Sequence, residues 1–248
     1  MIKKIIINAD DFGHTMGVSY GITDAHLNGV VTSTTALSVA SCFGQSMEKV
    51  KFLAPKLGIG VHLALTLKGA KPLLKLPSLC NEQGFFHSLA EAPDKVCPDE
   101  VKLEWEAQIL KFISTGHYPT HFDSHHHVHM NIEGLLEVME ELAAKFGVPI
   151  RHPGRETKAL STCEMLGDFY DENANQEFLN SMLDKIAESE NEYFELCVHP
   201  AFVDGNLQRL TSYSTPRIGE HMALTSCETK KKIAEKGFLL TNFKGLVR

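Results

Sequence analysis

Short apolar runs alternate along the chain with segments whose apolar residues recur at helical spacing. Residues 3–9 (KKIIINA) form a nearly continuous apolar run, which is typical of a strand buried on both faces of a parallel sheet. In residues 99–116, Trp105, Ile109 and Phe112 recur three or four positions apart and predict a helix. Apolar and β-branched runs predict six further strands, which are residues 30–39, 57–65, 119–125, 148–152, 193–200 and 237–243.

This alternation of strands and helices implies an α/β fold with a parallel sheet. The chain has 248 residues, a length at which α/β barrels are commonly one domain. No glycine-rich phosphate-binding pattern follows the first strand, which disfavours an open dinucleotide-binding sheet. We therefore expect a single domain over residues 1–248, a (β/α) barrel that is distorted or seven-stranded. Three segments without a clear period are expected to be long loops: residues 66–98, 153–174 and 201–220.

Polar side chains stand where the predicted strands end. The carboxyl ends of the parallel strands in such a barrel form one rim, and active sites lie at that rim. We therefore expect the aspartate, histidine and arginine side chains at these ends to face a common site. They are Asp10, Asp11, His62, Asp123, His125, Arg151, His152 and His199.

Each of these residues alone has a simpler structural explanation. Adjacent aspartates after a strand often cap a helix or form a turn, and a histidine such as His62 in an apolar run is more often a core residue. The five histidines of residues 121–130 could bind metal only adventitiously. The arrival of Asp and His at several strand ends together favours a shared site.

The residue types at these ends suit a metal ion. Two imidazoles and one carboxylate form a recurrent catalytic metal arrangement, and Asp11, His62 and His125 would supply it from three strands. Asp123 could accept a hydrogen bond from a ligand imidazole and fix its tautomer. His129 stays open as an alternative ligand, because it lies four residues after His125. This ligand set favours zinc or another transition metal over magnesium, which prefers oxygen ligands.

Composition argues against several classes of protein. The net charge is −7 with neutral histidines, and no segment is strongly basic, so nucleic acid is not the expected partner. No apolar stretch approaches the length of a membrane span, and the first apolar run is too short for a secretory signal. The six cysteines include no CxxC pair, which is typical of reduced thiols. We expect a cytoplasmic protein that binds neither nucleic acid nor membrane.

Five stretches of the chain resemble the YdjC-like carbohydrate deacetylase family, which includes chitooligosaccharide deacetylases. They are NADDFG (8–13), NGVVTSTTAL (28–37), GIGVHLALT (58–66), PTHFDSHHHVHM (119–130) and CVHPAF (197–202). ADDFG alone would be a weak signal, but together with DSHHHVHM and HPAF it is specific. The resemblance runs from the first strand to the last loop and keeps the motifs in order.

The resemblance implies a role for each residue in these motifs. Asp11, His62 and His125 become the ligands of one divalent metal ion, Asp10 the catalytic base and His199 the candidate general acid. The family is described with a deacetylase barrel, a cation often given as Mg²⁺, and dimers. The ion expected here is thus Mg²⁺ by resemblance, or Zn²⁺ or another transition metal by ligand chemistry, in a homodimer that acts on a small amino-sugar substrate.

These observations predict metal-assisted hydrolysis of an N-acetyl group on an amino sugar or short oligosaccharide. Tyr213, Arg217 and Arg151 are candidates for sugar or phosphate contacts, since Arg suits bidentate recognition of phosphate. A rival hypothesis is a glycoside or phospho-glycoside hydrolase that uses Asp10 and Asp123 as paired carboxylates, although this leaves the imidazoles unexplained. Two further hypotheses are a non-catalytic protein that binds metal or sugar, and a barrel with a degenerate site.

Overall fold

One parallel sheet forms the centre of the molecule. The structure, a computed structural model, describes residues 2–154, 157–158 and 163–246. Within them, seven strands pair in the order β4-β3-β2-β1-β6-β5, and β7 pairs with the start of β1. All the ladders are parallel, as the sequence predicted. The strands are β1 (Lys4–Phe12), β2 (Ser33–Ala36), β3 (Gly58–Leu63), β4 (Phe122–Ser124), β5 (Glu164–Leu166), β6 (Tyr193–Val198) and β7 (Leu239–Thr241).

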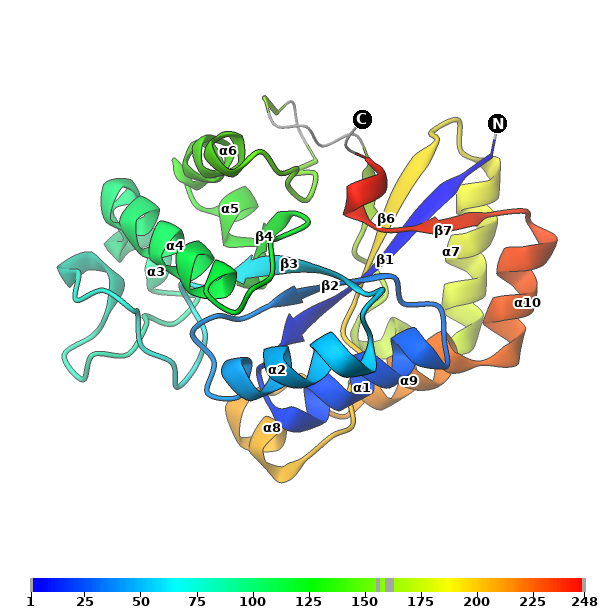
Figure 1. Cartoon of the computed structure of the whole chain (residues 1–248), viewed down its shortest axis with the longest axis horizontal. Helices are drawn as coiled ribbons and strands as arrows, with labels where there is room; N and C mark the ends of the chain where they lie inside the picture. Colours follow the sequence, from blue (N-terminus) through cyan, green and yellow to red (C-terminus); the bar gives the residue numbers. More distant parts are fainter. Residues whose placement is uncertain (1, 155–156, 159–162, 247–248) are drawn as a thin grey trace.

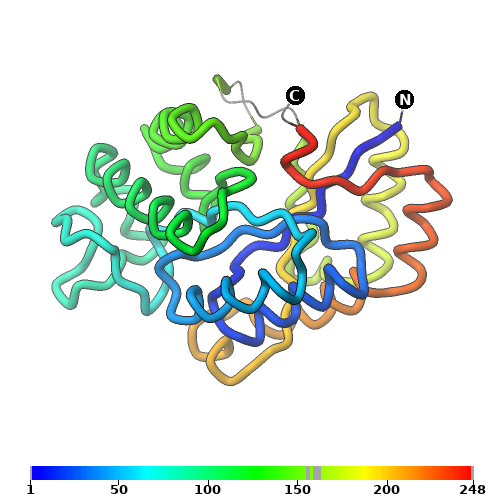
Figure 2. The backbone as a smooth tube through the Cα atoms, in the orientation of Figure 1, coloured from blue at the N-terminus to red at the C-terminus, as the bar shows by residue number. Residues whose placement is uncertain are grey.

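The sheet curls into a barrel that stays open. No ladder among the described residues joins β4 to β5, the two ends of the strand order. β7 runs beside the first residues of β1, so the beginning and the end of the chain lie on the same side of the molecule (Figure 2). The predicted α/β barrel is therefore confirmed, in a distorted and incompletely closed form.

Helices cover the outside of this sheet (Figure 1). α4 packs against β3 and α6, while α1 contacts α2 and α9, and α7 contacts α9 and α10. The longer helices are α1 (Met16–Leu27), α2 (Phe43–Leu53), α4 (Pro98–Ile113), α6 (Leu135–Phe146), α7 (Gln176–Glu188), α9 (Pro216–Thr225) and α10 (Cys227–Glu235). The short ones are α3 (Ala92–Lys95), α5 (Val128–Asn131), α8 (Gly205–Leu210), η1 (Pro77–Leu79), η2 (His125–His127), η3 (Asp171–Asn173) and η4 (Phe243–Gly245).

The core changes from apolar to polar along the strands. Ile5 and Ile7 of β1, Val61 of β3 and Trp105 of α4 are at most 1% exposed, and burial of side chains of this size stabilises a fold by about 1.5–3 kcal/mol each. Toward the carboxyl ends the buried residues become ionisable. Such groups are costly to bury unless they are paired, so these strand ends form a site at the expense of stability. They are Asp10, Asp11, His62 and Asp123.

Three expectations about the secondary structure were wrong. Residues 148–152 form only an isolated bridge between Ile150 and Phe122, and the fifth strand is instead β5, inside the segment expected as a loop. Residues 201–220 contain α8 and the first half of α9. Residues 66–98 are mostly irregular as expected, and Glu104 of α4 fastens them by accepting hydrogen bonds from two of their backbone amides. No helix among the described residues is long and apolar enough to span a membrane.

Candidate active site

The carboxyl ends of β1, β3, β4 and β6 meet at a cavity of about 540 Å³. This volume is within the range of small-molecule sites. The structure brings together here most of the residues that the sequence predicted to share a site. Those that line the cavity are Asp10, Asp11, His62, His125, His199, Tyr213 and Arg217.

Unusual backbone conformations aim two of these side chains. Asp11 has a φ of 70°, in the left-handed region that Asp tolerates better than most residues. The ladder between β1 and β2 shifts register at the same point, so the chain turns and both adjacent aspartates reach the site. After β4, His126 and His127 also have positive φ values, of 56° and 52°. This turn ends the strand abruptly and leaves His125 at the rim.

Asp11, His62 and His125 form a compact group of potential ligands. Their ligand atoms all lie within 4.8 Å of one another. Asp11 Oδ1 is 3.5 Å from His62 Nε2 and 3.1 Å from His125 Nδ1. This oxygen is buried and accepts no hydrogen bond from the described residues, while Arg217 occupies the other oxygen at 2.6 Å. Two imidazole nitrogens and one unsatisfied carboxylate oxygen could hold a divalent cation.

Asp123 orients the imidazole of His62. Its Oδ1 lies 2.7 Å from His62 Nδ1, which leaves Nε2 directed toward Asp11. Thr35 holds the carboxylate from the other side by donating a hydrogen bond of 2.9 Å to Oδ2. Burial lowers the pKa of His62, but Asp123 and Asp10 outweigh it and raise the pKa to about 9. A cation that binds His62 Nε2 would therefore compete with a proton.

His129 lies outside this group of potential ligands. It belongs to α5, and its Nδ1 is 2.5 Å from the Ser124 hydroxyl, which also accepts the His129 backbone amide. Burial lowers the pKa of His129 to about 3, so the ring is neutral. Its hydrogen bonds to Ser124 therefore stabilise the turn after β4.

Arg151 pairs with buried carboxylates beneath the cavity and does not itself line the cavity. Its side chain is fully buried, and its guanidinium binds both oxygens of Asp10 at 2.7 and 2.8 Å. It also lies 3.0 Å from Asp123 and 2.7 Å from Glu195. The prediction that Arg151 contacts the substrate is thus wrong, because three carboxylates enclose its charge. Burial raises the pKa of Asp10, but Arg151 outweighs burial and holds it well below its usual range.

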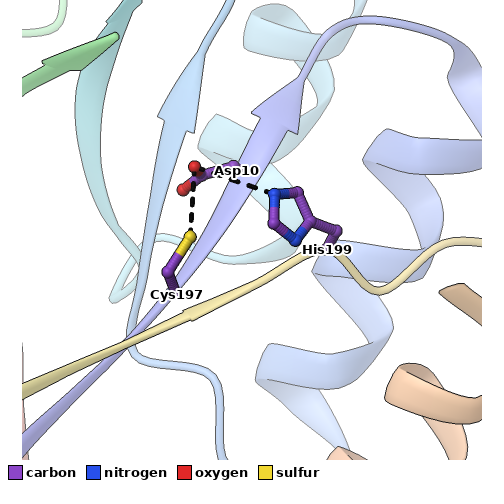
Figure 3. A group of neighbouring side chains, drawn as sticks. All are labelled: Asp10, Cys197 and His199. Carbon is purple, nitrogen blue, oxygen red and sulfur yellow. Dashed lines mark hydrogen bonds and ion pairs between the residues drawn. The ribbon is translucent and has the colours of Figure 1, made fainter. Parts of the chain in front are cut away.

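His199 lies beside Asp10, and Cys197 approaches the same carboxylate (Figure 3). His199 follows β6, and its Nε2 is 3.9 Å from Asp10 Oδ2. Cys197 Sγ donates to the same oxygen at 3.4 Å. Glu220 accepts hydrogen bonds from the backbone amide of His199 and from the hydroxyl of Tyr213. Burial lowers the pKa of His199 to about 3, so its imidazole is neutral in the resting protein.

An aromatic wall beside His199 was missed in the sequence. Tyr170 stacks on Tyr213 with ring centroids 3.8 Å apart, and its edge faces the His199 ring at 5.6 Å. Tyr170 is 43% exposed and lines the cavity. It lies in the aperiodic segment 153–174, where no spacing distinguishes it. Sequence reasoning also missed Cys197, which lines the cavity, and three residues that act through other side chains of the site: Thr35, Glu195 and Glu220.

Comparisons with known proteins identify the family. The model of the YdjC-like protein family matches residues 4–235. The chain belongs to the YdjC-like family. The resemblance recognised in the sequence motifs is thereby confirmed.

Two deacetylases and one crystal structure are similar to this chain over nearly its whole length. A carbohydrate deacetylase of Enterococcus faecalis V583 is 46% identical over 257 residues, with 98% of each chain covered. A chitooligosaccharide deacetylase of Salmonella schwarzengrund is 37% identical over 251 residues, covering 96% of this chain and 97% of its own. A crystal structure from Enterococcus faecalis V583, named as a candidate cellobiose-phosphate cleavage protein, shows 44% identity and a TM-score of 0.96 over 100% of both chains.

Proposed function

We propose that this protein is a metal-dependent hydrolase that removes an N-acetyl group from an amino sugar or short oligosaccharide. The observation that carries the proposal is the convergence of Asp11, His62 and His125 within 4.8 Å, beside Asp10 and His199 in one cavity. The names of the similar deacetylases support it. A bound divalent cation would polarise the acetyl carbonyl and make an attacking water more acidic.

The protein's own residues would then move the protons. Asp10 is ionised and can take a proton from the water, but its low pKa makes it a weak base. His199 is neutral and lies 3.9 Å away, beyond a direct hydrogen bond, so a small movement of its ring would let it receive this proton and pass it to the departing amine nitrogen. Protonation matters because an amide anion leaves poorly. General acid–base help of this kind is typically worth ~10²–10⁴-fold in rate.

The cavity walls suit a sugar ring. The exposed face of Tyr170, backed by Tyr213, offers an apolar platform next to His199. Tyr213 and Arg217 line the same cavity, and we propose them as further substrate contacts. Arg217 already donates hydrogen bonds to Asp11 and to the Tyr213 carbonyl, so only part of its guanidinium is available.

The name of the crystal structure from Enterococcus favours a second candidate function, the cleavage of a phosphorylated disaccharide. Asp10 and Asp123 were the expected carboxylate pair for this chemistry. Asp123 is fully buried, however, and both carboxylates bind the same guanidinium of Arg151. Asp123 does not line the cavity, so these two carboxylates cannot flank a glycosidic bond there, as hydrolysis requires. Deacetylation therefore fits the geometry better.

Acetate release tests the proposal. Chelated enzyme is supplied with one cation at a time and offered N-acetylated mono- and oligosaccharides, each with and without a phosphate group. Cation-dependent acetate release is the expected result. Released monosaccharide without acetate would favour the second function, and metal binding without turnover of any sugar would indicate a non-catalytic binding protein.

The same panel addresses the identity of the ion. We propose a transition metal such as Zn²⁺ from the ligand chemistry, with Mg²⁺ as the alternative that the family resemblance implies. A single domain over residues 1–248, a homodimer and a cytoplasmic location complete the proposal, and chromatography with light scattering tests the dimer.

A further inference from the structure

A second group of potential metal ligands lies beside the first. Asp10, Cys197 and His199 each direct one ligand atom into the same space, and these atoms lie within 4.8 Å of one another (Figure 3). Asp10 ends β1, Cys197 belongs to β6, and His199 follows β6. All three line the cavity, so a small ion reaches them from solvent.

The spacing of these atoms suits a tetrahedral ion. With bonds of ~2.3 Å to sulfur and ~2.0 Å to oxygen or nitrogen, tetrahedral ligands lie ~3.3–3.6 Å apart. Cys197 Sγ is 3.4 Å from Asp10 Oδ2, and His199 Nε2 is 3.9 Å from the same oxygen. The imidazole makes no hydrogen bond through either ring nitrogen within the described residues. Small side-chain movements would therefore complete three of four positions, and the cavity leaves the fourth open.

The chemistry of the three atoms selects the ion. Thiolate and imidazole ligands prefer zinc and similar soft ions over magnesium or calcium. Binding breaks the S–H bond of Cys197, forms a metal–sulfur bond and releases one proton to solvent, with no change of oxidation state. Both oxygens of Asp10 already accept hydrogen bonds from Arg151, whereas Asp11 Oδ1 accepts none from the described residues, so this group is a weaker site than Asp11, His62 and His125.

The geometry points to a second, lower-affinity site for a thiophilic divalent cation at Asp10, Cys197 and His199. An ion bound there occupies the two side chains to which the reaction assigns the base and the acid. Excess zinc therefore inhibits the enzyme, whereas excess magnesium does not. The inhibition rests on the proposed deacetylase function, but the binding of the ion does not.

Cobalt and zinc titrations of the chelated protein test the site. We expect two equivalents of zinc per chain by equilibrium dialysis. With cobalt, a thiolate-to-metal charge-transfer absorption should appear only with the second equivalent. Cys197→Ala should bind one equivalent without this absorption, and so should Cys197→Ser, which is nearly isosteric and keeps a donor to Asp10. Cys163→Ala removes another buried cysteine, outside the cavity, and should keep both equivalents.

Activity provides an independent measurement. Acetate release by the unaltered protein should fall at least tenfold as the second zinc binds, and Cys197→Ala should escape this inhibition. A single equivalent in the unaltered protein, or an unchanged second equivalent in both Cys197 variants, would overturn the inference. If no cation yields acetate but the charge-transfer absorption appears, the deacetylase proposal fails and the second site stands. The cobalt spectrum of the unaltered protein requires no variant to fold.

Discussion

Replacement of Asp123 by Asn tests how the imidazole of His62 is prepared for a cation. The Asp123 carboxylate is fully buried, and its Oδ1 lies 2.7 Å from His62 Nδ1. In this place it fixes the ring with Nε2 toward Asp11 and makes that nitrogen more basic. Asn keeps the shape but lacks the charge. Loss of such a partner typically weakens metal affinity ~10–100-fold, or about 1.4–2.7 kcal/mol.

The same carboxylate also favours the proton that competes with the cation. Burial lowers the pKa of His62, but Asp123 and Asp10 raise it to about 9. Below that pH the proton must leave before Nε2 can bind a metal, so wild-type affinity should fall about tenfold for each pH unit. Asp123→Asn removes much of this competition. The loss of metal affinity in Asp123→Asn, relative to wild type, should therefore be small near pH 7 and reach ~10–100-fold only above pH 9.

Competition between the protein and a chelator of known metal affinity, from about pH 7 to pH 10, measures both the loss of metal affinity and its dependence on pH. Glu195→Gln is the matched control, because Glu195 is equally buried and pairs with Arg151 at 2.7 Å rather than with His62. It should follow the wild-type curve. Wild-type affinity in Asp123→Asn at the highest pH, or an equal loss in Glu195→Gln, would refute the role of Asp123 in orienting His62.

Three further changes separate roles within the site. Asp10→Asn should still bind metal and lose ~10²–10⁴-fold in kcat; full acetate release would remove Asp10 from the base role. Tyr170→Ala should raise KM with little change in kcat, and Tyr170→Phe should restore KM if stacking is the contact. Burial raises the pKa of Glu220 from 4.5 to about 7, so the folded protein binds this proton more tightly than the unfolded chain does. The resulting contribution to the free energy of unfolding is complete below pH 4.5 and is lost as the pH rises from there through 7. Glu220→Gln should therefore gain up to about 3 kcal/mol over wild type between these values, measured by urea unfolding at several pH values.

The periodic elements were the predictable part of the fold. The long apolar run of β1 and the stripe of Trp105, Ile109 and Phe112 in α4 report burial directly, because burial on two faces or on one stripe leaves a local pattern. The segment 148–152 resembled a strand by composition. Only the bridge at Ile150 forms, because pairing depends on neighbours that the local sequence does not specify.

The position of site residues was predictable, but their partners were not. Asp11, His62 and His125 come together because parallel strands deliver their carboxyl ends to one rim. That rule states where a residue lies and not what it faces. Arg151 also lies just beyond a bridge at this rim, yet it points beneath the cavity to three buried carboxylates. No local pattern distinguishes an arginine that binds substrate from one that neutralises buried charge.

The charge balance around Arg151 bears on how Asp10 can serve as a base. One guanidinium faces Asp10, Asp123 and Glu195, and burial raises the pKa of Glu195 to about 7 even though Arg151 opposes this. The excess negative charge is therefore relieved at Glu195, and Asp10 stays ionised with both oxygens bound to Arg151. A carboxylate held in this way is always available but weakly basic. In the proposed mechanism, proton transfer to it would depend on how acidic the attacking water becomes, so a cation held by Asp11, His62 and His125 would set the rate at which Asp10 can act.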